Sequence, residues 1–264
     1  MANTDHIPQI EEIFALEQKG NLKKALLLIE KLQSNNTPVA KSTIDLIKAP
    51  ILRKQGQYEA AIELLLPLQH IAELSKEEHY QIQKELGINY RRQVKTTQAQ
   101  QHYMAALKLA YELKDKNKQA QSHSNLGTLY DTLNDLDQSM FQQLKAQKLL
   151  IGSKDNELIA TNFYNLANLS HRLDDLAQSE YFYKKALEFD IKTKNQINIA
   201  DTSLQLAKLV YKRGDYEQAL PLLKNAYSRL ADLNAYEGMA TAKHTLMQLY
   251  LKLEHKHMAF SRQK

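Results

Sequence analysis

Side-chain amides recur at a regular position along the chain, and they are the groups best suited to binding chemistry. Asn125, Asn165 and Gln205 each stand directly before a leucine, and Asn168 lies one helical turn after Asn165. An amide offers both a donor and an acceptor, so it can pair with the N–H and C=O groups of an extended peptide of any sequence. We expect one such amide per repeat to grip a peptide backbone. The alternative is that these amides are ordinary polar residues on an exposed face.

Two interruptions limit this amide ladder, and a second row of residues adds charge. Glu85 and Thr245 stand where further amides would belong, which predicts a binding centre within about residues 120–210. A basic residue recurs near the end of several of the same segments: Lys54, Arg92, Arg172, Lys212 and Lys252, and Lys84, Arg91 and Lys208 lie on them as well. Such a row would attract acidic peptides or a carboxylate terminus. Thr132 interrupts this row of basic residues. The alternative to a charge-selective groove is that these residues are ordinary solvated lysines and arginines on an exposed face.

Residue patterns typical of catalysis are absent from the sequence. It has no phosphate-binding glycine loop, no G-x-S-x-G and no H-E-x-x-H motif. The chain has no cysteine, which excludes thiolate chemistry and cysteine-based zinc sites. Its nine histidines are scattered, and His255 and His257 would lie on different faces of a helix. We therefore expect no enzyme activity, no cofactor and no metal site.

The elements that must position these residues follow an internal repeat. Leu86, Leu126, Leu166 and Leu206 recur at a constant interval, and each is followed by Gly or Ala. A second ladder of alanines keeps the same step and lies midway between the leucines: Ala106, Ala146, Ala186 and Ala226. A repeat of this length is typical of a stacked solenoid and not of a single globular core.

Each period divides into two amphipathic helices, for example 78–92 and about 97–114. Short joints such as Asn134-Asp135, Asp174-Asp175 and Gly214-Asp215 separate them. The first residue of a joint would end one helix in a left-handed conformation, and the second would cap the next helix. Three prolines fall inside predicted helices, where each would bend the helix: Pro50, Pro67 and Pro221.

The pattern resembles the tetratricopeptide repeat family. The family's Leu-Gly-x-x-Tyr and Ala-x-x-x-aromatic motifs are matched by Leu86-Gly87-Ile88-Asn89-Tyr90 with Ala99 and Tyr103, and by Leu126-Gly127-Thr128-Leu129-Tyr130. Looser copies contain Leu166-Ala167 and Leu206-Ala207. The departures are a 40-residue period, longer than is usual for the family, the absence of tryptophan and weak first units. Such long periods are similar to those of kinesin light chain and of many bacterial signalling proteins.

The resemblance implies an all-α, right-handed superhelical α-solenoid of antiparallel helix pairs, with about six repeats and a C-terminal partial repeat. We expect a single solenoid over 1–264: two degenerate repeats in 1–77, four clear repeats in 78–237 and a partial or capping repeat in 238–264. It also implies that the first helix of each pair lines a concave groove, and that asparagine at the position of Asn125 and Asn165 binds a peptide backbone. The two-carboxylate clamp of some co-chaperones is not predicted, since Ile88 replaces an asparagine of that set.

Composition bears on location and partners. The formal net charge of +5 is too small for a dedicated nucleic-acid surface. No stretch reaches the 18 or so apolar residues of a membrane helix, and no signal peptide is visible. We therefore expect a cytoplasmic protein without membrane insertion, or else a periplasmic sensor domain taken from an anchored protein.

Three functions fit these observations. We favour a non-catalytic scaffold that binds a protein or peptide, acidic segments included, as the sensory or adaptor module of a bacterial signalling protein. The alternative is a peptide-pheromone receptor of the same repeat type, although residues 1–40 are short for the extra domain that such regulators carry. A basic helical-repeat RNA binder is less favoured, because most tyrosines occupy packing positions such as Tyr103 and Tyr183.

Overall fold

The structure is a computed structural model that describes residues 8–18, 20–34, 40–233 and 235–261. All regular secondary structure in these ranges is helical, and they contain no strand. The chain divides into two compact units, residues 1–133 and 134–264, and each unit is described by itself. The all-α solenoid architecture is confirmed, because successive helices pack in series within each unit. Continuity of one solenoid across residues 133 and 134 stays a prediction.

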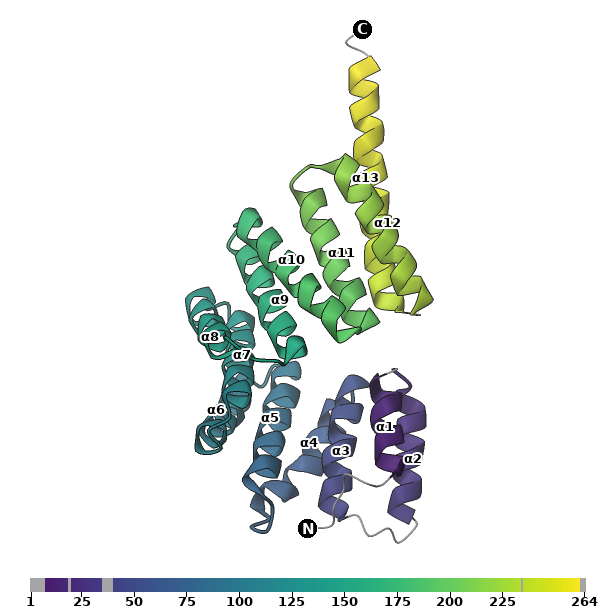
Figure 1. The fold of residues 1–264 in the computed structure, drawn as a ribbon. Coiled ribbons are helices and arrows are strands. Elements are labelled where there is room, and N and C mark those ends of the chain that lie inside the picture. The colour runs from purple at the N-terminus through teal and green to yellow at the C-terminus, as the bar shows by residue number, and fades with distance from the viewer. Residues whose placement is uncertain (1–7, 19, 35–39, 234, 262–264) are drawn as a thin grey trace. The chain divides into compact units, whose positions relative to one another are not determined.

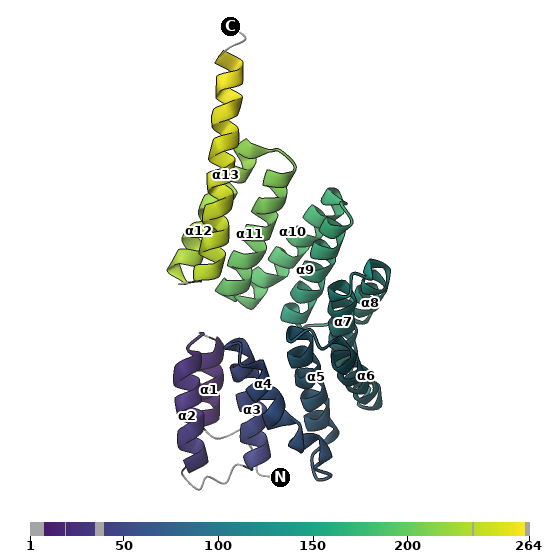
Figure 2. The ribbon, with the colours of Figure 1, turned by 180° about the vertical axis from the view of Figure 1, so that it is seen from behind.

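The first unit is a series of short antiparallel helices followed by longer ones. The helices α1 and α2 pack against each other, as do α3 and α4, and the first helices α3, α5 and α7 contact one another in turn (Figure 2). Their bounds are α1 Pro8–Gln18, α2 Leu22–Ser34, α3 Lys41–Lys54, α4 Tyr58–Leu65, the 3₁₀ helix η2 Pro67–His70, α5 Lys76–Arg92, α6 Thr96–Glu112 and α7 Lys116–Thr132.

The second unit holds the helices that line the candidate site. Consecutive helices α9 to α13 lie side by side in alternating directions, and α11 also contacts α13 (Figure 1). Their bounds are α8 Leu136–Leu149, α9 Asn156–Arg172, α10 Leu176–Thr193, α11 Gln196–Lys212, α12 Tyr216–Asp232 and α13 Tyr236–Ser261.

Short joints set where the helices begin and end. The equivalent residues Val94, Asn134, Asp174 and Gly214 all have positive φ angles between 60° and 90°. At the following position, the Asp135 and Asp175 carboxylates accept hydrogen bonds from the backbone N–H groups of the next helix. These two carboxylate caps confirm the predicted role of the joints. Asp215 makes no such side-chain bond.

The repeated small and large residues form the interior of both units. Leu86, Leu126, Leu166 and Leu206 are all buried, as are the four alanines at 106, 146, 186 and 226. The close approach of paired helices is clearest at Gly87, where an added Cβ would lie 2.6 Å from Cε1 of the Tyr103 ring and closer still to its Cδ1. Glycine there lets the aromatic ring fill the space between α5 and α6.

Two sequence expectations need correction. Pro67 does not lie inside an α-helix: α4 ends at Leu65, and Pro67 begins the short 3₁₀ helix, where its missing N–H costs no helical bond. Pro50 and Pro221 do lie within α3 and α12 as predicted.

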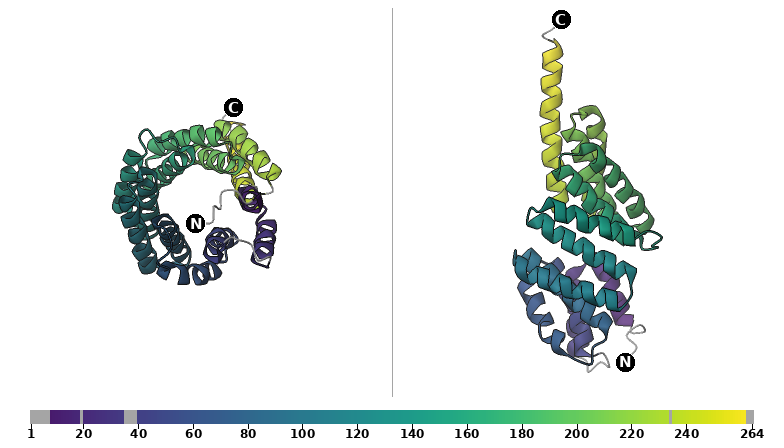
Figure 3. Two further views of the ribbon diagram at one scale, coloured as in Figure 1. Left: turned by 60° about the horizontal axis from the view of Figure 1, so that its bottom comes forward. Right: turned by 90° about the vertical axis from the view of Figure 1, so that its left-hand side faces the viewer.

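The last repeat also differs from expectation. Helix α13 is one unbroken helix of 26 residues, so residues 255–261 do not form a separate second helix. Its far end extends beyond α11 and α12 (Figure 3). Glu254-His255 stands one period after the Gly214-Asp215 joint, and the helix passes through this position without a turn. The side chains after Glu254 lie outside the described residues. None of the described helices is long and apolar enough to span a membrane.

Candidate functional site

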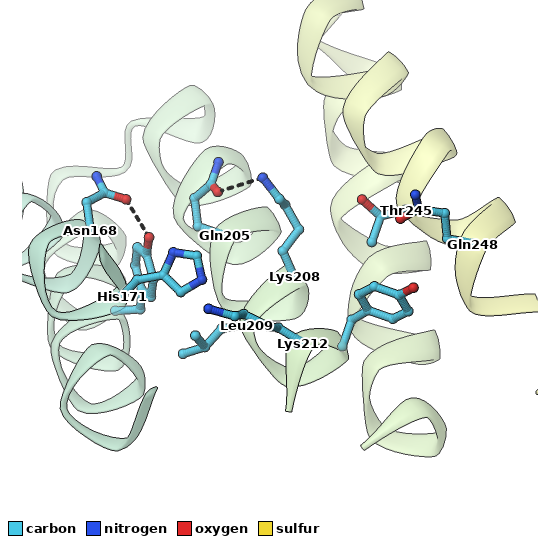
Figure 4. A pocket seen from close by; sticks show the side chains of 10 residues that line it. Asn168, His171, Gln205, Lys208, Leu209, Lys212, Thr245 and Gln248 are labelled. Atoms are coloured by element: carbon cyan, nitrogen blue, oxygen red, sulfur yellow. Dashed lines mark hydrogen bonds between the residues drawn. The ribbon is translucent and has the colours of Figure 1, made fainter. Parts of the chain in front are cut away.

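A pocket of about 260 Å³ opens on the second unit between the first helices α9, α11 and α13. Figure 4 shows polar side chains from the three helices pointing toward one another around it. Its lining consists of Asn168, His171, Tyr183, Gln205, Lys208, Leu209, Tyr211, Lys212, Thr245 and Gln248.

The pocket repeats the period of the chain. Asn168, Lys208 and Gln248 occupy one position in three successive first helices, and Gln205 and Thr245 share another. His171 and Tyr211 are related by the same step. Because these helices present one face in the same direction, residues far apart in sequence meet at one site. The site is therefore a product of stacking and not of a local motif.

Asn168 is oriented by a tyrosine of the paired helix. The Tyr183 hydroxyl donates to Asn168 Oδ1 at 2.5 Å. Burial, followed by the charge of Asp201, raises the pKa of Tyr183, so its proton stays available for this bond. Its amide also donates to the Tyr164 hydroxyl, which leaves one amide N–H for another partner. It is therefore suited to donate to a carbonyl or carboxylate oxygen.

A hydrogen-bonded chain supports Gln205 on α11. The Tyr164 hydroxyl donates to Asp201 Oδ2 at 2.8 Å, and Gln205 Nε2 donates to Asp201 Oδ1 at 3.4 Å. Lys208 Nζ in turn donates to Gln205 Oε1 at 3.3 Å. Burial, aided by Asp201, raises the pKa of Tyr164. The chain holds the Gln205 amide and the Lys208 ammonium group together at the pocket.

The pocket is electropositive. Lys212 pairs with Asp174 at 3.1 Å, whereas Lys208 forms no ion pair with any residue in the described ranges. Burial, followed by the charges of Lys212 and Lys208, lowers the pKa of His171, and Asp174 only partly opposes this. Burial and the two ammonium groups together disfavour the protonated form of this imidazole. An anionic group would relieve this concentration of positive charge.

The structure brings some of the predicted site residues together and leaves others apart. Asn168, Gln205, Lys208 and Lys212 line the pocket. Asn165 is half-buried on α9 and does not line it. Arg172 lies outside it too, and its guanidinium donates to Asn134 Oδ1 at 2.6 Å.

The remaining predicted residues belong to the first unit. Asn125 is half-buried on α7, and Arg92 is exposed at the end of α5. Lys84 donates to Gln81 at 2.6 Å and lies 3.6 Å from the Glu85 carboxylate, so its charge is partly neutralised. The amide ladder from Asn125 to Asn165 therefore stays a prediction.

Sequence reasoning missed the rest of the lining, which consists of His171, Tyr183, Leu209, Tyr211, Thr245 and Gln248. The constant step of the repeat could have found Gln248 from Lys208, and Tyr211 from His171. The repeat predicts that Tyr183 packs against the preceding helix, but not that its hydroxyl donates to Asn168. The described residues contain no group of three or more His, Asp or Glu placed to hold a metal ion.

Comparison with known proteins identifies the repeats. Residues 157–232 and 120–149 match two models of the tetratricopeptide repeat. No curated protein sequence matches the chain.

Solved structures share the fold at low sequence identity. A Rap protein complexed with Competence and Sporulation Factor has a TM-score of 0.66 at 15% identity, covering 96% of this chain and 73% of the other. Aspartyl phosphate phosphatase F of Bacillus subtilis has a TM-score of 0.61 at 15% identity, covering 96% and 71%. BtubC (BKLC) of P. vanneervenii has a TM-score of 0.58 at 18% identity, covering 83% and 91%. These similarities show a shared helical fold over most of the chain, and the family matches show that residues 120–149 and 157–232 carry tetratricopeptide repeats, which recur here with a 40-residue period.

Proposed function

We propose that the protein is a non-catalytic scaffold that binds an extended segment of a partner protein on the first-helix face of the second unit. The observation that supports this most directly is the pocket itself, where three successive first helices contribute equivalent polar side chains. A periodic set of donors and acceptors suits a ligand that is itself periodic, which an extended peptide backbone is.

The chemistry of the pocket favours an acidic segment. Asn168 has one amide N–H to offer, and Lys208 has no carboxylate partner among the described residues. Peptide carbonyls would accept from the amides, while a carboxylate would be placed near Lys208 and Lys212. Burial is the main cause of the lowered pKa of His171, and the charges of Lys212 and Lys208 add to it, which is consistent with a positive potential at the pocket.

A role in signalling is the finer part of the proposal. It is supported by the structural similarity to a Rap protein complexed with Competence and Sporulation Factor and to an aspartyl phosphate phosphatase. A regulator whose repeats respond to a bound signalling factor is the alternative to an adaptor. The adaptor and the regulator would use the same binding face. They differ in whether binding only recruits the partner or also changes the activity of the protein.

The test is binding of a fluorescein-labelled decapeptide of alternating Glu and Ala to the full chain, followed by fluorescence anisotropy. A matched peptide of alternating Gln and Ala measures the contribution of charge. We expect saturable binding of the acidic peptide, weakened roughly tenfold by Lys208→Gln. Gln205→Ala should weaken both peptides, because it removes an amide and not a charge.

Lys243→Gln is the matched control, since Lys243 is an exposed lysine of α13 that does not line the pocket. Equal losses in Lys208→Gln and Lys243→Gln would mean that only overall charge matters, and the pocket would be rejected as the site. If both variants bound the acidic peptide as tightly as the wild type, the pocket would also be rejected as the site.

A further inference from the structure

A second cavity in the same unit has different chemistry from the first. It measures about 580 Å³ and lies between the end of α8, the start of α9 and the second half of α10. Its walls include Leu144, Ile151, Phe163 and Phe189, and none of its lining residues belongs to the polar pocket. Ligand pockets in proteins typically have volumes of about 300–1,000 Å³, so this cavity has the size of a small-molecule site.

The cavity exists because α8 is short. The equivalent helices α6 and α12 have 17 residues and α10 has 18, whereas α8 has 14. The chain leaves the helix after Leu149, and Gly152 adopts a positive φ of 79° at the point where the last turn would stand. The missing turn leaves space beside α9 and α10 that no side chain of the unit fills.

The walls of the cavity carry apolar surface that faces solvent. Ile151 is 81% exposed and Leu144 is 46% exposed. Inside, the Phe163 and Phe189 rings stack with centroids 5.9 Å apart and planes at 19°. An apolar ligand that covered this surface would be stabilised by the hydrophobic effect.

The rim adds a charge preference. Glu188 accepts from Lys185 at 3.1 Å and from Lys192 at 3.0 Å. Lys148, also at the rim, forms no ion pair with any residue that the structure describes. The charged residues that line the cavity are Lys148, Lys185 and Glu188, so its rim carries one more positive than negative charge. An apolar body with an anionic head complements this arrangement.

We propose that this cavity binds a small amphiphilic anion, such as a medium-chain carboxylate, with its hydrocarbon part on Phe163 and Phe189 and its carboxylate near Lys148. The site is separate from the polar pocket, so the two can be occupied at once. The second unit would then bind a small molecule as well as the peptide of the proposed function. The proposal for this cavity does not depend on that function.

The experiment is isothermal titration calorimetry of decanoate into the full chain, below the concentration at which decanoate forms micelles, with decanol as the uncharged comparison. We expect saturable binding of one decanoate per chain. Lys148→Glu should weaken decanoate roughly three- to tenfold and leave decanol nearly unchanged. Lys145→Glu is the control, because Lys145 lies on the same helix and does not line the cavity.

A second pair of variants tests the apolar wall. Leu144→Asp should abolish binding of both ligands, whereas Phe141→Asp, at an equally exposed position of α8 outside the cavity, should not. Sedimentation of each variant shows whether the face instead joins two copies. Non-saturable binding, equal losses in the controls, or a dimer that Leu144→Asp dissociates would each overturn the proposal.

Discussion

The same repeat position carries opposite roles in the two units. Glu85 on α5 and Gln205 on α11 are equivalent residues three periods apart. Glu85 is buried and accepts from Arg53 Nε at 2.9 Å, with Lys84 at 3.6 Å. Gln205 is half-buried and lines the polar pocket beside Lys208. One position is closed by a structural ion pair, and the other faces the pocket at which we propose that a peptide binds.

The difference lies in the neighbouring helix. The first unit places a guanidinium from α3 against the α5 position, which satisfies the carboxylate inside the protein. The second unit places no such cation against Gln205 from α9, and the amide is held by Asp201 of its own helix. The repeat sets where a side chain points, whereas the neighbour decides whether it is a packing group or a binding group.

Breaking the closed position should cost the most stability. Arg53→Met removes the main partner of a carboxylate that is only 8% exposed, which leaves a nearly buried charge. We expect a loss of about 3 kcal/mol in the free energy of unfolding, measured by urea denaturation followed by circular dichroism.

Arg213→Met is the comparison in the second unit. Arg213 pairs with Glu180 and Asp215 in an exposed setting, so its removal should change stability far less. Similar losses in the two variants would show that Glu85 is not a closed structural position.

The next effect concerns close helix packing. Gly87→Ala places a Cβ against the Tyr103 ring and should cost about 2 kcal/mol of unfolding free energy, because the core there is already filled. Ala167 occupies the equivalent place in the second unit and is accommodated near Tyr183. Tyr103→Leu should relieve the clash, so the double variant should be more stable than the sum of the single losses. Additive losses would rule out the contact as the cause.

A gain in stability is expected at the joint of the first unit. Val94 has a φ of 61°, a conformation that a β-branched residue adopts with strain, where the equivalent joints use Asn134, Asp174 and Gly214. Val94→Asn should stabilise the protein by about 1 kcal/mol, seen as a higher urea midpoint. Gly214→Val should move the midpoint the other way, and a Val94→Asn variant with an unchanged midpoint would show that the joint is unstrained.

The weakest effect is a pH dependence confined to the open position. The pKa of His171 is lowered by burial and by Lys212 and Lys208, so a bound acidic peptide should raise it. Binding then takes up protons, and affinity for the acidic decapeptide should rise severalfold as pH falls through and below 6.5. Anisotropy titrations of the wild type and His171→Gln measure this.

The stability of the free protein should change with pH in the opposite direction to peptide affinity. In the free protein the depressed pKa disfavours the charged imidazole, so the contribution of His171 to stability is present above pH 6.5 and is lost as pH falls through its lowered pKa. The effect should be small because His171 is partly exposed to solvent. A pH dependence of binding that persists in His171→Gln would assign it to another group.

Much of the fold could be predicted because its signals are local and repeated. The leucine and alanine ladders, the left-handed joints and the capping aspartates all act within one or two helices. The predictions failed where a local signal was misjudged: Pro67 begins a new short helix, and α13 continues without a break through 255–261. The candidate site was predicted in part, since four of the nine expected residues line one pocket.

Periodicity in the amino-acid sequence is enough to place the helix pairs and the face on which polar residues lie, because it dictates which side chains share a helix surface. Which of those residues meet is settled by packing between helices. Tyr183 orients Asn168, Arg53 closes Glu85, and the short α8 opens an apolar cavity, each through a neighbouring helix. The physical reason is that burial and pairing depend on distances between helices, and no spacing along a chain specifies those distances.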